Sequence, residues 1–430
     1  MSFSTLIRKW FAQLVQRSFL LLWFGLLLMP ALIHLTKIDV PDATLENRQL
    51  AAIPLPIKDL DSALNWTAQM DAYLKDHFGL RQTMIAWNNQ IRYFGLGESA
   101  SPQLTVGKEH MLFFNSHEAA YPNRMLNFLC GKDIRPEIIN ELATRVSGFL
   151  LKARQINPNT SIGFVPTKPV LYTEYLPDWM QAECQQKTHT LPVFLQTIAQ
   201  FNATDAQQTA LSASIYYPWT AMQKLKSSVQ LYPKEDFHWH GRGAQVFAQD
   251  IAERQWQLPA LRHFNFYRET VSSDMQRFMP GVALKPTIES PDYANAQITA
   301  CLGPQCFPEL ASAAKLSDVS RYRLIPAGVN PKGNNRISGK KLLLISDSFG
   351  NGVAGYFSAY FDEVWHISIN NSGQLSSQEM LDLQASFESY APDKVLYLLH
   401  DYSLTCFSGK LHYCPVDLVK VLSQLHPKAK

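Results

Sequence analysis

The stretch Lys341–Gly355, KLLLISDSFGNGVAG, decides the fold. Its opening run of apolar residues is typical of a strand that is buried on both faces of a parallel sheet. Ser, Asp and Gly residues follow, and we expect a helix over Val353–Phe361. A strand that leads through such a turn into a helix predicts an open α/β sheet, in which ligands bind at the carboxyl ends of the strands.

Other segments repeat this alternation of strand and helix, which predicts a mainly parallel sheet flanked by helices. We expect further strands at Leu104–Val106, Met111–Phe114, Ser161–Val165, Val229–Tyr232, Glu363–Ile369 and Lys394–Leu399. We expect further helices at Arg135–Ile156, Leu191–Asn202, Gly243–Arg254 and Ser377–Tyr390. Residues 258–335 are punctuated by Pro and Gly and show no clear periodicity.

The composition excludes several classes of protein. Of the 430 residues, 46% are apolar and only 17% are charged, which argues against disorder and against a coiled coil. The 39 basic and 36 acidic residues leave a net charge of +3. Because no run of Lys and Arg interleaves with aromatic residues, we expect no binding of nucleic acid.

The N-terminal region predicts a membrane anchor. Residues 18–36 carry no charge and would span ~28 Å as a helix, about one hydrocarbon core. Arg8, Lys9 and Arg17 precede this run, so the N-terminus is expected in the cytoplasm and the rest outside. A cleaved signal peptide is the alternative, but the long run without an A-x-A-like exit favours an uncleaved single-pass anchor.

These signals divide the chain into four expected parts. They are a cytoplasmic tail over 1–17, a transmembrane anchor over 18–36, a stalk and helical region over 37–102, and one domain over 103–430. The stalk carries Pro41, Pro54 and Pro56, which oppose a helix, and helices are expected near 63–74 and 82–93.

Cysteine usage agrees with export. All six Cys follow the apolar run, and short spacing suggests the pairs Cys301–Cys306 and Cys406–Cys414, which leaves Cys130–Cys184. Some free buried thiols are the alternative. No Cys or His group has the spacing of a zinc site, and no cofactor motif such as a P-loop or G-x-G-x-x-G occurs, so we expect neither metal nor cofactor.

Ser348 is the candidate nucleophile. It would lie after the central strand and near the start of the next helix, where free backbone N–H groups can face an oxyanion. A serine hydroxyl needs a base within hydrogen-bond reach to become a nucleophile. Alternatively, Asp347 and Ser348 only cap the helix. Ser346 is a rival serine that more simply ends the strand.

The segment Tyr232–Gln245, YPKEDFHWHGRGAQ, supplies the candidate base. In an extended backbone Asp236 and His238 face the same side, so the carboxylate can orient the imidazole. A surface turn, or a core histidine bonded to an aspartate, is the alternative. His240 and His400 are rival bases, each without an acid two residues before it.

Asp236, His238 and Ser348 can together form a triad, since a triad depends on geometry and not on chain order. A metal site that uses Asp236, His238, His240 and Asp347 is a weaker alternative, because two His and scattered acids are a poor ligand signal.

The two motifs resemble a known family. D-x-H-W followed by a helix, and a later strand ending in D-S-F-G, are similar to the SGNH-hydrolase-like proteins of the AlgJ/AlgX and DHHW type. These are periplasmic O-acetyltransferase components of bacterial exopolysaccharide machinery. The resemblance covers roughly residues 44–400 and includes, in family order, Glu46–Arg48, Asp76–Arg81, Val106–Phe114 and Pro166–Lys168.

The resemblance implies an SGNH-like domain in which Ser348 is the nucleophile, His238 the base and Asp236 its orienter. The family's turn often reads G-T-S or R-D-S, whereas this chain has S-D-S. The candidate substrate-binding or oxyanion residues are Lys168, Trp239, Asn351 and Asn370. Asn371 is a rival that could equally be a turn residue.

The expected function is therefore transfer of acetyl groups to an exopolysaccharide through a serine acyl-enzyme in the bacterial periplasm. Because acetyl-CoA is cytoplasmic, the resemblance implies a membrane-bound acyltransferase partner that hands acetyl across the membrane. An SGNH-type carbohydrate esterase is the close alternative, since the same triad serves both reactions. A non-catalytic polysaccharide-binding or assembly subunit is the third.

Overall fold

The computed structural model describes residues 3–39, 49–132, 134–186, 189–201, 211–316, 318–325, 339–408, 411 and 421–422. The chain divides into two compact units. We call them the helical unit, which comprises Met1–Ser101 and Met275–Leu284, and the sheet unit, which comprises Pro102–Asp274 and Lys285–Lys430. The short segment Met275–Leu284 thus leaves the sheet unit directly after Asp274 and joins the helical unit.

The helical unit consists of helices. They are α1 (Phe3–Thr36), α3 (Leu60–Asp76), α4 (Arg81–Gln90), its π-helical continuation η1 (Ile91–Leu96) and the 3₁₀ turn η5 (Gln276–Phe278). Asp59 caps α3 by accepting a hydrogen bond from the backbone N–H of Ser62 at 2.7 Å. Among the described residues, the stretch Leu14–Thr36 of α1 is the one helix long and apolar enough to cross a membrane.

The sheet unit is built on a seven-stranded sheet with the order β4-β3-β11-β9-β10-β8-β7. The first five of these strands are parallel, and β8 and β7 are added antiparallel at one edge. Their bounds are β3 (Thr160–Val165), β4 (Ile215–Tyr216), β7 (Ile298–Leu302), β8 (Val319–Leu324), β9 (Lys341–Ser346), β10 (Glu363–Ser368) and β11 (Lys394–His400). This architecture confirms the predicted fold class.

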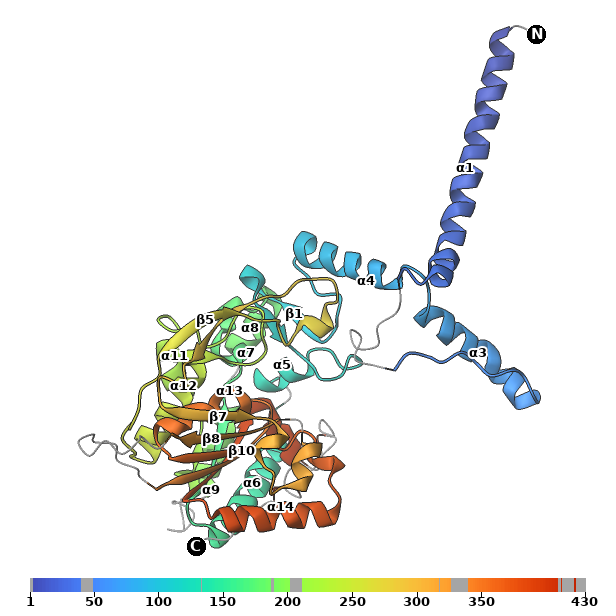
Figure 1. The fold of residues 1–430 in the computed structure, drawn as a ribbon. Coiled ribbons are helices and arrows are strands. Elements are labelled where there is room, and N and C mark those ends of the chain that lie inside the picture. The colour runs from blue at the N-terminus through green and yellow to red at the C-terminus, as the bar shows by residue number, and fades with distance from the viewer. Residues whose placement is uncertain are drawn as a thin grey trace. The chain divides into compact units, whose positions relative to one another are not determined.

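Helices cover both faces of this sheet, and the side chains of the central strands alternate between them. On one side lie α6 (Pro136–Ile156), α9 (Thr190–Phe201) and α14 (Ser377–Tyr390), and on the other α12 (Gly241–Gln249) and α13 (Gly350–Val353) (Figure 1). Leu342 and Leu344 of β9 share a buried cluster with Phe247 of α12. Tyr397 of β11 points the other way and stacks edge-on against Phe149 of α6.

The remaining elements are short. They are β1 (Leu104–Val106), β2 (Leu112–Phe114), α5 (Arg124–Leu129), α7 (Lys168–Leu171), α8 (Asp178–Gln186), α11 (Trp219–Leu225), β5 (Phe266–Thr270), β6 (Thr287–Pro291), and the 3₁₀ or π turns η2 (Lys108–His110), η3 (Thr173–Tyr175), η4 (Asp250–Gln255), η6 (Pro304–Cys306), η7 (Ala311–Lys315), η8 (Ala354–Ala359), η9 (Ser372–Gln374) and η10 (Asp401–Phe407).

The strand order creates a switch point between β9 and β11. From β9 the chain moves to β10 on one side, and it then returns across β9 to place β11 on the other side. The connections that leave β9 and β11 therefore run to opposite sides, and in open α/β sheets ligands bind at the carboxyl ends of two such strands. The residues that follow β9 and β11 are Asp347–Ser348 and Asp401, so the candidate nucleophile lies at this point.

Two expected elements are wrong, and one segment without an assigned structure contains strands. Val229–Tyr232 forms bends and not a strand. The helix expected over Val353–Phe361 is only the single turn α13 followed by the 3₁₀ helix η8. Residues 258–335, which showed no periodicity, contain β5, β6, β7 and β8, because antiparallel edge strands are half exposed and need no apolar run.

Two predicted disulfides are present, Cys130–Cys184 and Cys301–Cys306. Cys406 is also disulfide-bonded, and Cys414, its predicted partner, lies outside the described residues. None of the described cysteines is free, so the alternative of free buried thiols is wrong for them. Disulfides persist in oxidising compartments, in agreement with a domain that is exported.

Candidate active site

Ser348 occupies the turn between β9 and α13, at the carboxyl end of the central strand. Its side chain is partly exposed, whereas Asp347 and Phe349 on either side are buried. Within the described part of the chain, the backbone N–H of Ser348 donates no hydrogen bond. A half-exposed hydroxyl beside an unused N–H group is the arrangement that attack on an ester requires.

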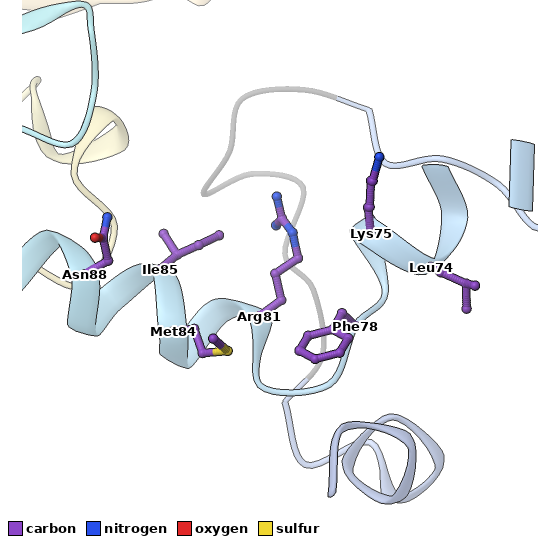
Figure 2. A pocket seen from close by; sticks show the side chains of 7 residues that line it. All are labelled: Leu74, Lys75, Phe78, Arg81, Met84, Ile85 and Asn88. Carbon is purple, nitrogen blue, oxygen red and sulfur yellow. The ribbon is translucent and has the colours of Figure 1, made fainter. Parts of the chain in front are cut away.

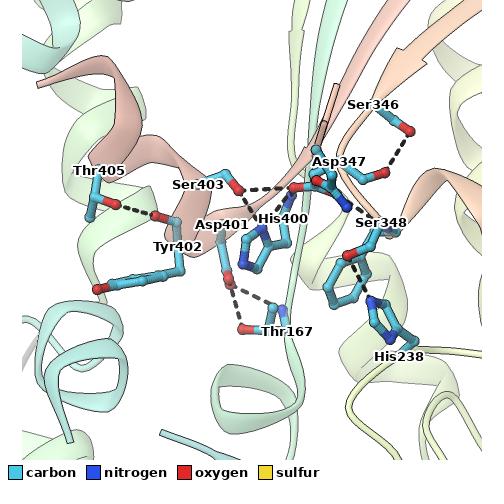
Figure 3. A network of polar contacts seen from close by, with 12 residues as sticks. Thr167, His238, Ser346, Asp347, Ser348, His400, Asp401, Tyr402, Ser403 and Thr405 are labelled. Carbon is cyan, nitrogen blue, oxygen red and sulfur yellow. Dashed lines mark hydrogen bonds and ion pairs between the residues drawn. The ribbon is translucent and has the colours of Figure 1, made fainter. Parts of the chain in front are cut away.

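His238 lies against this hydroxyl. Its Nε2 is 2.8 Å from Ser348 Oγ, across a sequence separation of 110 residues (Figure 3). The imidazole also contacts the ring of Phe349, with centroids 4.8 Å apart, so packing as well as hydrogen bonding fixes its orientation. The predicted approach of the D-x-H-W segment to the D-S-F-G turn is therefore present in the structure.

The carboxylate beside His238 is Asp274, and the predicted contact with Asp236 is absent. Asp274 Oδ2 lies 2.5 Å from His238 Nδ1. The two carboxylate oxygens of Asp274 also accept hydrogen bonds from the backbone N–H groups of Phe237 and His238, at 2.8 and 3.1 Å. Burial alone raises the pKa of Asp274, but the hydrogen bond and charge of His238 outweigh it and lower the pKa to about 2.

Asp236 instead contacts the backbone of Asp274, the residue that contacts His238. Its Oδ1 accepts the backbone N–H of Asp274 at 3.1 Å, and its Oδ2 lies 3.2 Å from Nε2 of His240. The prediction failed because residues 233–240 form turns and bends, so positions two apart do not share a face as they would in a strand. His240, a rival base in the sequence, is thus the residue paired with Asp236.

Lys168 and Trp239 are buried, which contradicts their predicted contact with substrate. The ammonium of Lys168 donates to the carbonyl oxygens of Leu112 at 3.0 Å, Lys234 at 3.1 Å and Asp236. Burial lowers the pKa of Lys168 to about 7, although nearby carboxylates oppose the shift. This side chain therefore fastens the segment that carries His238 to the end of β3.

Trp239 holds the same segment against the nucleophile turn. Its indole Nε1–H donates to the carbonyl oxygen of Phe349 at 2.9 Å, and its side chain has no exposed surface. A Cβ at Gly352 would approach the indole ring to 2.8 Å, so the glycine lets the turn lie close to the indole. Trp239 therefore sets the distance between His238 and Ser348 from inside the core.

A second histidine–carboxylate pair lies beside the first (Figure 3). Asp347 Oδ2 is 2.7 Å from Nδ1 of His400 and accepts the hydroxyl of Ser403 at 2.9 Å. Burial alone raises the pKa of Asp347, but His400 and these hydrogen bonds keep it below its usual value. Asp347 Oδ1 also accepts the N–H of Phe349 at 3.0 Å, so this carboxylate shapes the turn that presents Ser348.

Ser346 and the polar residues at the ends of β3 and β11 complete the surroundings. Ser346 Oγ is fully buried and lies 2.8 Å from Nε2 of His366, so it ends the strand as expected. Asp401 accepts the hydroxyl of Thr167 at 2.7 Å, and burial raises its pKa to about 6. The contacts of Asp347 with His400 and of Asp401 with Thr167 thus connect the ends of β9, β11 and β3 near the half-exposed Ser348.

Asn351 and Asn370 are exposed near the turn. The N–H of Asn351 donates to the carbonyl oxygen of Ser348 at 3.3 Å, and the N–H of Asn370 donates to Ser368 Oγ at 3.3 Å. Neither side chain contacts Ser348 among the described residues, so their roles stay predictions. No group of three His, Cys, Asp or Glu side chains in the described ranges is arranged to hold a metal, and the weaker metal alternative loses its ligand set.

Asp274 is the residue that sequence reasoning missed. It lies 36 residues after His238, in the segment VSSDMQRF, where nothing distinguishes it from an ordinary turn-forming aspartate. The chain brings it back because β5 and β6 pair as a ribbon around this segment. Only a prediction of that ribbon could have pointed to it.

Three solved structures are similar to this chain at low identity. A DHHW family protein from Eubacterium siraeum is 14% identical with a TM-score of 0.42, covering 68% of this chain and 90% of that one. The O-acetyltransferase domain of Pseudomonas putida AlgJ is 16% identical with a TM-score of 0.42, covering 74% and 98%. Bacillus cereus PatB1, with a sulfonyl adduct, is 13% identical with a TM-score of 0.39, covering 64% and 92%.

The first two carry the names of the family that the sequence motifs resemble. The likeness concerns the fold, and the chemistry of the site rests on the distances given above. No protein-family model and no curated protein matches the chain.

Proposed function

We propose that this protein is a serine-dependent O-acetyltransferase that acts on a polysaccharide. The observation that carries the proposal is the continuous contact from Ser348 Oγ through His238 to Asp274, at 2.8 and 2.5 Å. The choice of acetyl as the transferred group and of a polysaccharide as the acceptor rests on the motifs that resemble the AlgJ/AlgX and DHHW family.

The reaction follows from this geometry in two transfers. His238 Nε2 takes the proton of Ser348, and the serine oxygen attacks the acetyl carbonyl carbon of a donor ester. Asp274 stabilises the imidazolium, the unused N–H of Ser348 faces the oxyanion, and the donor oxygen leaves with the proton. A sugar hydroxyl then gives its proton to His238 and attacks the acetyl carbon, the bond from this carbon to Ser348 Oγ breaks, and His238 returns the proton to Ser348 Oγ as the acetylated polymer leaves.

The proposed setting is the periplasmic side of a bacterial inner membrane. The apolar stretch Leu14–Thr36 serves as a single-pass anchor, with residues 1–17 in the cytoplasm. The disulfides of the sheet unit agree with this side of the membrane. A membrane-bound acyltransferase acts as the partner that supplies acetyl, since acetyl-CoA does not cross the bilayer.

Mass spectrometry of the intact chain after mixing with p-nitrophenyl acetate tests the proposal. We expect one added acetyl group, placed by peptide mapping on Ser348, and no adduct in Ser348→Ala. Ser346→Ala is the matched control, because Ser346 lies two residues away but bonds to the buried His366. A Ser348→Ala chain that still supports acetylation of the polymer in cells would point to the non-catalytic subunit.

The same acyl-enzyme separates transfer from hydrolysis. Purified protein is given the donor with and without an acetyl-free oligosaccharide, and acetate and acetylated sugar are both measured. For a transferase we expect the sugar to take acetyl at the expense of acetate. Release of acetate at one rate, whether or not sugar is present, would identify an esterase.

A further inference from the structure

Helix α4 and its continuation η1 expose a continuous apolar stripe. Met84, Trp87, Ile91 and Phe94 follow one another at helical spacing, and their exposed fractions are 55%, 64%, 65% and 67%. We call these four residues the apolar stripe. Such a row of large side chains is unfavourable in water, and it indicates a surface with a partner.

The opposite face of the same helix already has its partner inside the helical unit. Asn89 donates to the carbonyl oxygen of Pro280 at 2.8 Å, and Gln90 donates to that of Gly281 at 2.7 Å. Gly281 has a φ of +86°, and a Cβ there would collide with Ala86. The orientation of α4 is therefore fixed by the segment Met275–Leu284, and this contact leaves the apolar stripe facing outward.

The beginning of α4 lies beside the last turns of α1. A Cβ at Gly79 would collide with the carbonyl oxygen of Pro30, so the backbones are in close contact there. The backbone N–H of Thr83 donates to Asp39 at 3.4 Å. The ring of His34 lies 6.4 Å from that of Tyr73 and meets it edge-on. The corner between α3 and α4 thus surrounds the point where α1 ends.

A hollow of about 580 Å³ opens at this corner (Figure 2). Its apolar lining comes from Leu74, Phe78, Met84 and Ile85, and its polar lining from Lys75, Arg81 and Asn88. Lys75 pairs with Asp71 at 2.6 Å, but both side chains are mostly exposed, so this pair is weak. Residues 81–96 contain Arg81 and Arg92 and no acidic residue.

We propose that α4 and η1 lie on the membrane from which α1 emerges, with the apolar stripe in the outer part of the lipid layer and an anionic phospholipid in the hollow. Lys75 and Arg81 contact the lipid phosphate, and Phe78 and Met84 contact its acyl chain. The inference rests on the proposed anchoring by α1. An apolar face with Trp beside basic residues is typical of interfacial helices. The ion pairs of Lys75 with Asp71 and of Arg92 with Glu98 are exposed and therefore weak.

Lipid fits this surface better than a protein partner does. The apolar stripe begins at Met84, directly after Thr83, whose N–H contacts Asp39 just beyond the anchor, so the bilayer surface is always within reach. An intramolecular contact of this kind acts at a high effective concentration and needs little affinity of its own. A protein would have to displace lipid from the base of α1 to occupy the same residues.

Photocrosslinking of the full-length chain in nanodiscs tests the proposal. The discs contain phosphatidylethanolamine with about a quarter phosphatidylglycerol, an anionic lipid. The photoreactive residue p-benzoylphenylalanine replaces Trp87, Ile91 or, as the matched control, Leu381, an exposed apolar residue of α14 in the sheet unit. We expect lipid adducts at Trp87 and Ile91 to exceed those at Leu381 by about fivefold or more.

Charge reversal gives the second measurement. In discs with the photoreactive residue at Trp87, Arg81→Glu together with Lys75→Glu should at least halve the share of phosphatidylglycerol among the adducts. Equal lipid adducts at Trp87 and Leu381 would overturn the proposal. Adducts to a second protein in place of lipid, in native membranes, would overturn it in favour of a protein partner. Neither readout uses acetyl transfer, so failure here and failure of the proposed reaction are distinguishable.

Discussion

Replacement of Asp274 by asparagine tests which carboxylate serves His238. The change Asp274→Asn keeps the size of the side chain and removes its charge. The sequence alone favours Asp236 in this role, whereas the structure places Asp274 Oδ2 at 2.5 Å from the imidazole. The two assignments therefore predict opposite activities for the isosteric variants Asp274→Asn and Asp236→Asn.

The contact with His238 sets the size of the expected loss. Burial opposes the shift, but the hydrogen bond and charge of His238 lower the pKa of Asp274 from 3.8 to about 2. A hydrogen bond to a charged group, such as the one from His238 Nδ1 to this carboxylate, contributes on the order of 2 kcal/mol, which is roughly 30-fold in rate. An asparagine can also hold the wrong tautomer of the imidazole, so we expect kcat/KM to fall by between about 30-fold and 10⁴-fold.

Hydrolysis of p-nitrophenyl acetate by the full chain in detergent is the assay, and the thermal midpoint of each variant controls for folding. Asp236→Asn is the matched control. Its Oδ1 can still accept the N–H of Asp274, and it makes no contact with His238, so we expect a loss of less than about tenfold. Full activity in Asp274→Asn, with Asp236→Asn as inactive as Ser348→Ala, would refute the assignment.

Three further predictions concern stability, measured by urea unfolding of the full chain in detergent. Lys168→Met removes the ammonium that donates to the buried carbonyl oxygens of Leu112 and Asp236 and to that of Lys234, which still accepts the N–H of Leu112, and it should cost about 3 kcal/mol; a loss below 1 kcal/mol would contradict the role of Lys168 in holding this segment. Burial lowers the pKa of His366 from 6.5 to about 3, so between these pH values unfolding takes up a proton, and the free energy of unfolding decreases by up to about 1.4 kcal/mol for each unit by which the pH is lowered. His366→Asn should flatten this dependence by one proton, and an unchanged slope would count against it. Loss of Cys130–Cys184, which closes a separation of 54 residues, should cost about 4 kcal/mol, against about 2 for Cys301–Cys306 with its separation of 5. Equal losses on replacing each pair by alanine would show that loop closure does not set them.

The central sheet could be predicted because its strands are buried on both faces. Short, nearly continuous apolar runs such as Lys341–Ile345 and Lys394–Leu399 indicate buried strands. The strands β9 and β11 begin and end within one residue of the expected bounds. The strands β7 and β8 were missed because neither is buried along its whole length: β7 exposes three of its five residues at the edge of the sheet, and β8 beside it mixes buried, partly buried and exposed residues. Their pattern depends on neighbours that the local sequence does not contain.

The site divides in the same way. The approach of His238 to Ser348 follows from two motifs that each stand out locally. The position of Asp274 depends on the pairing of β5 with β6, which the local sequence does not reveal. Its role becomes visible only in the structure, where its carboxylate accepts the N–H groups of Phe237 and His238. Lys168 and Trp239 stand in conspicuous motifs, yet they act on the backbone of the site, because a residue type alone does not reveal whether its side chain faces inward.

The two histidine–carboxylate pairs at the switch point are not equivalent, and the difference favours His238 as the base of the proposed reaction. His400 is 7% exposed, its Nδ1 is occupied by Asp347, and its Nε2 is buried without a hydrogen-bond partner in the described structure. His238 keeps 27% of its side chain exposed, and its Nε2 faces the hydroxyl of Ser348. A base has to exchange protons with donor and acceptor alcohols that arrive from solvent, which His238 can reach and His400 cannot. His400 instead contacts Asp347, and Asp347 accepts the N–H of Phe349 in the turn, so the second pair positions Ser348, which the first pair activates in the proposed reaction.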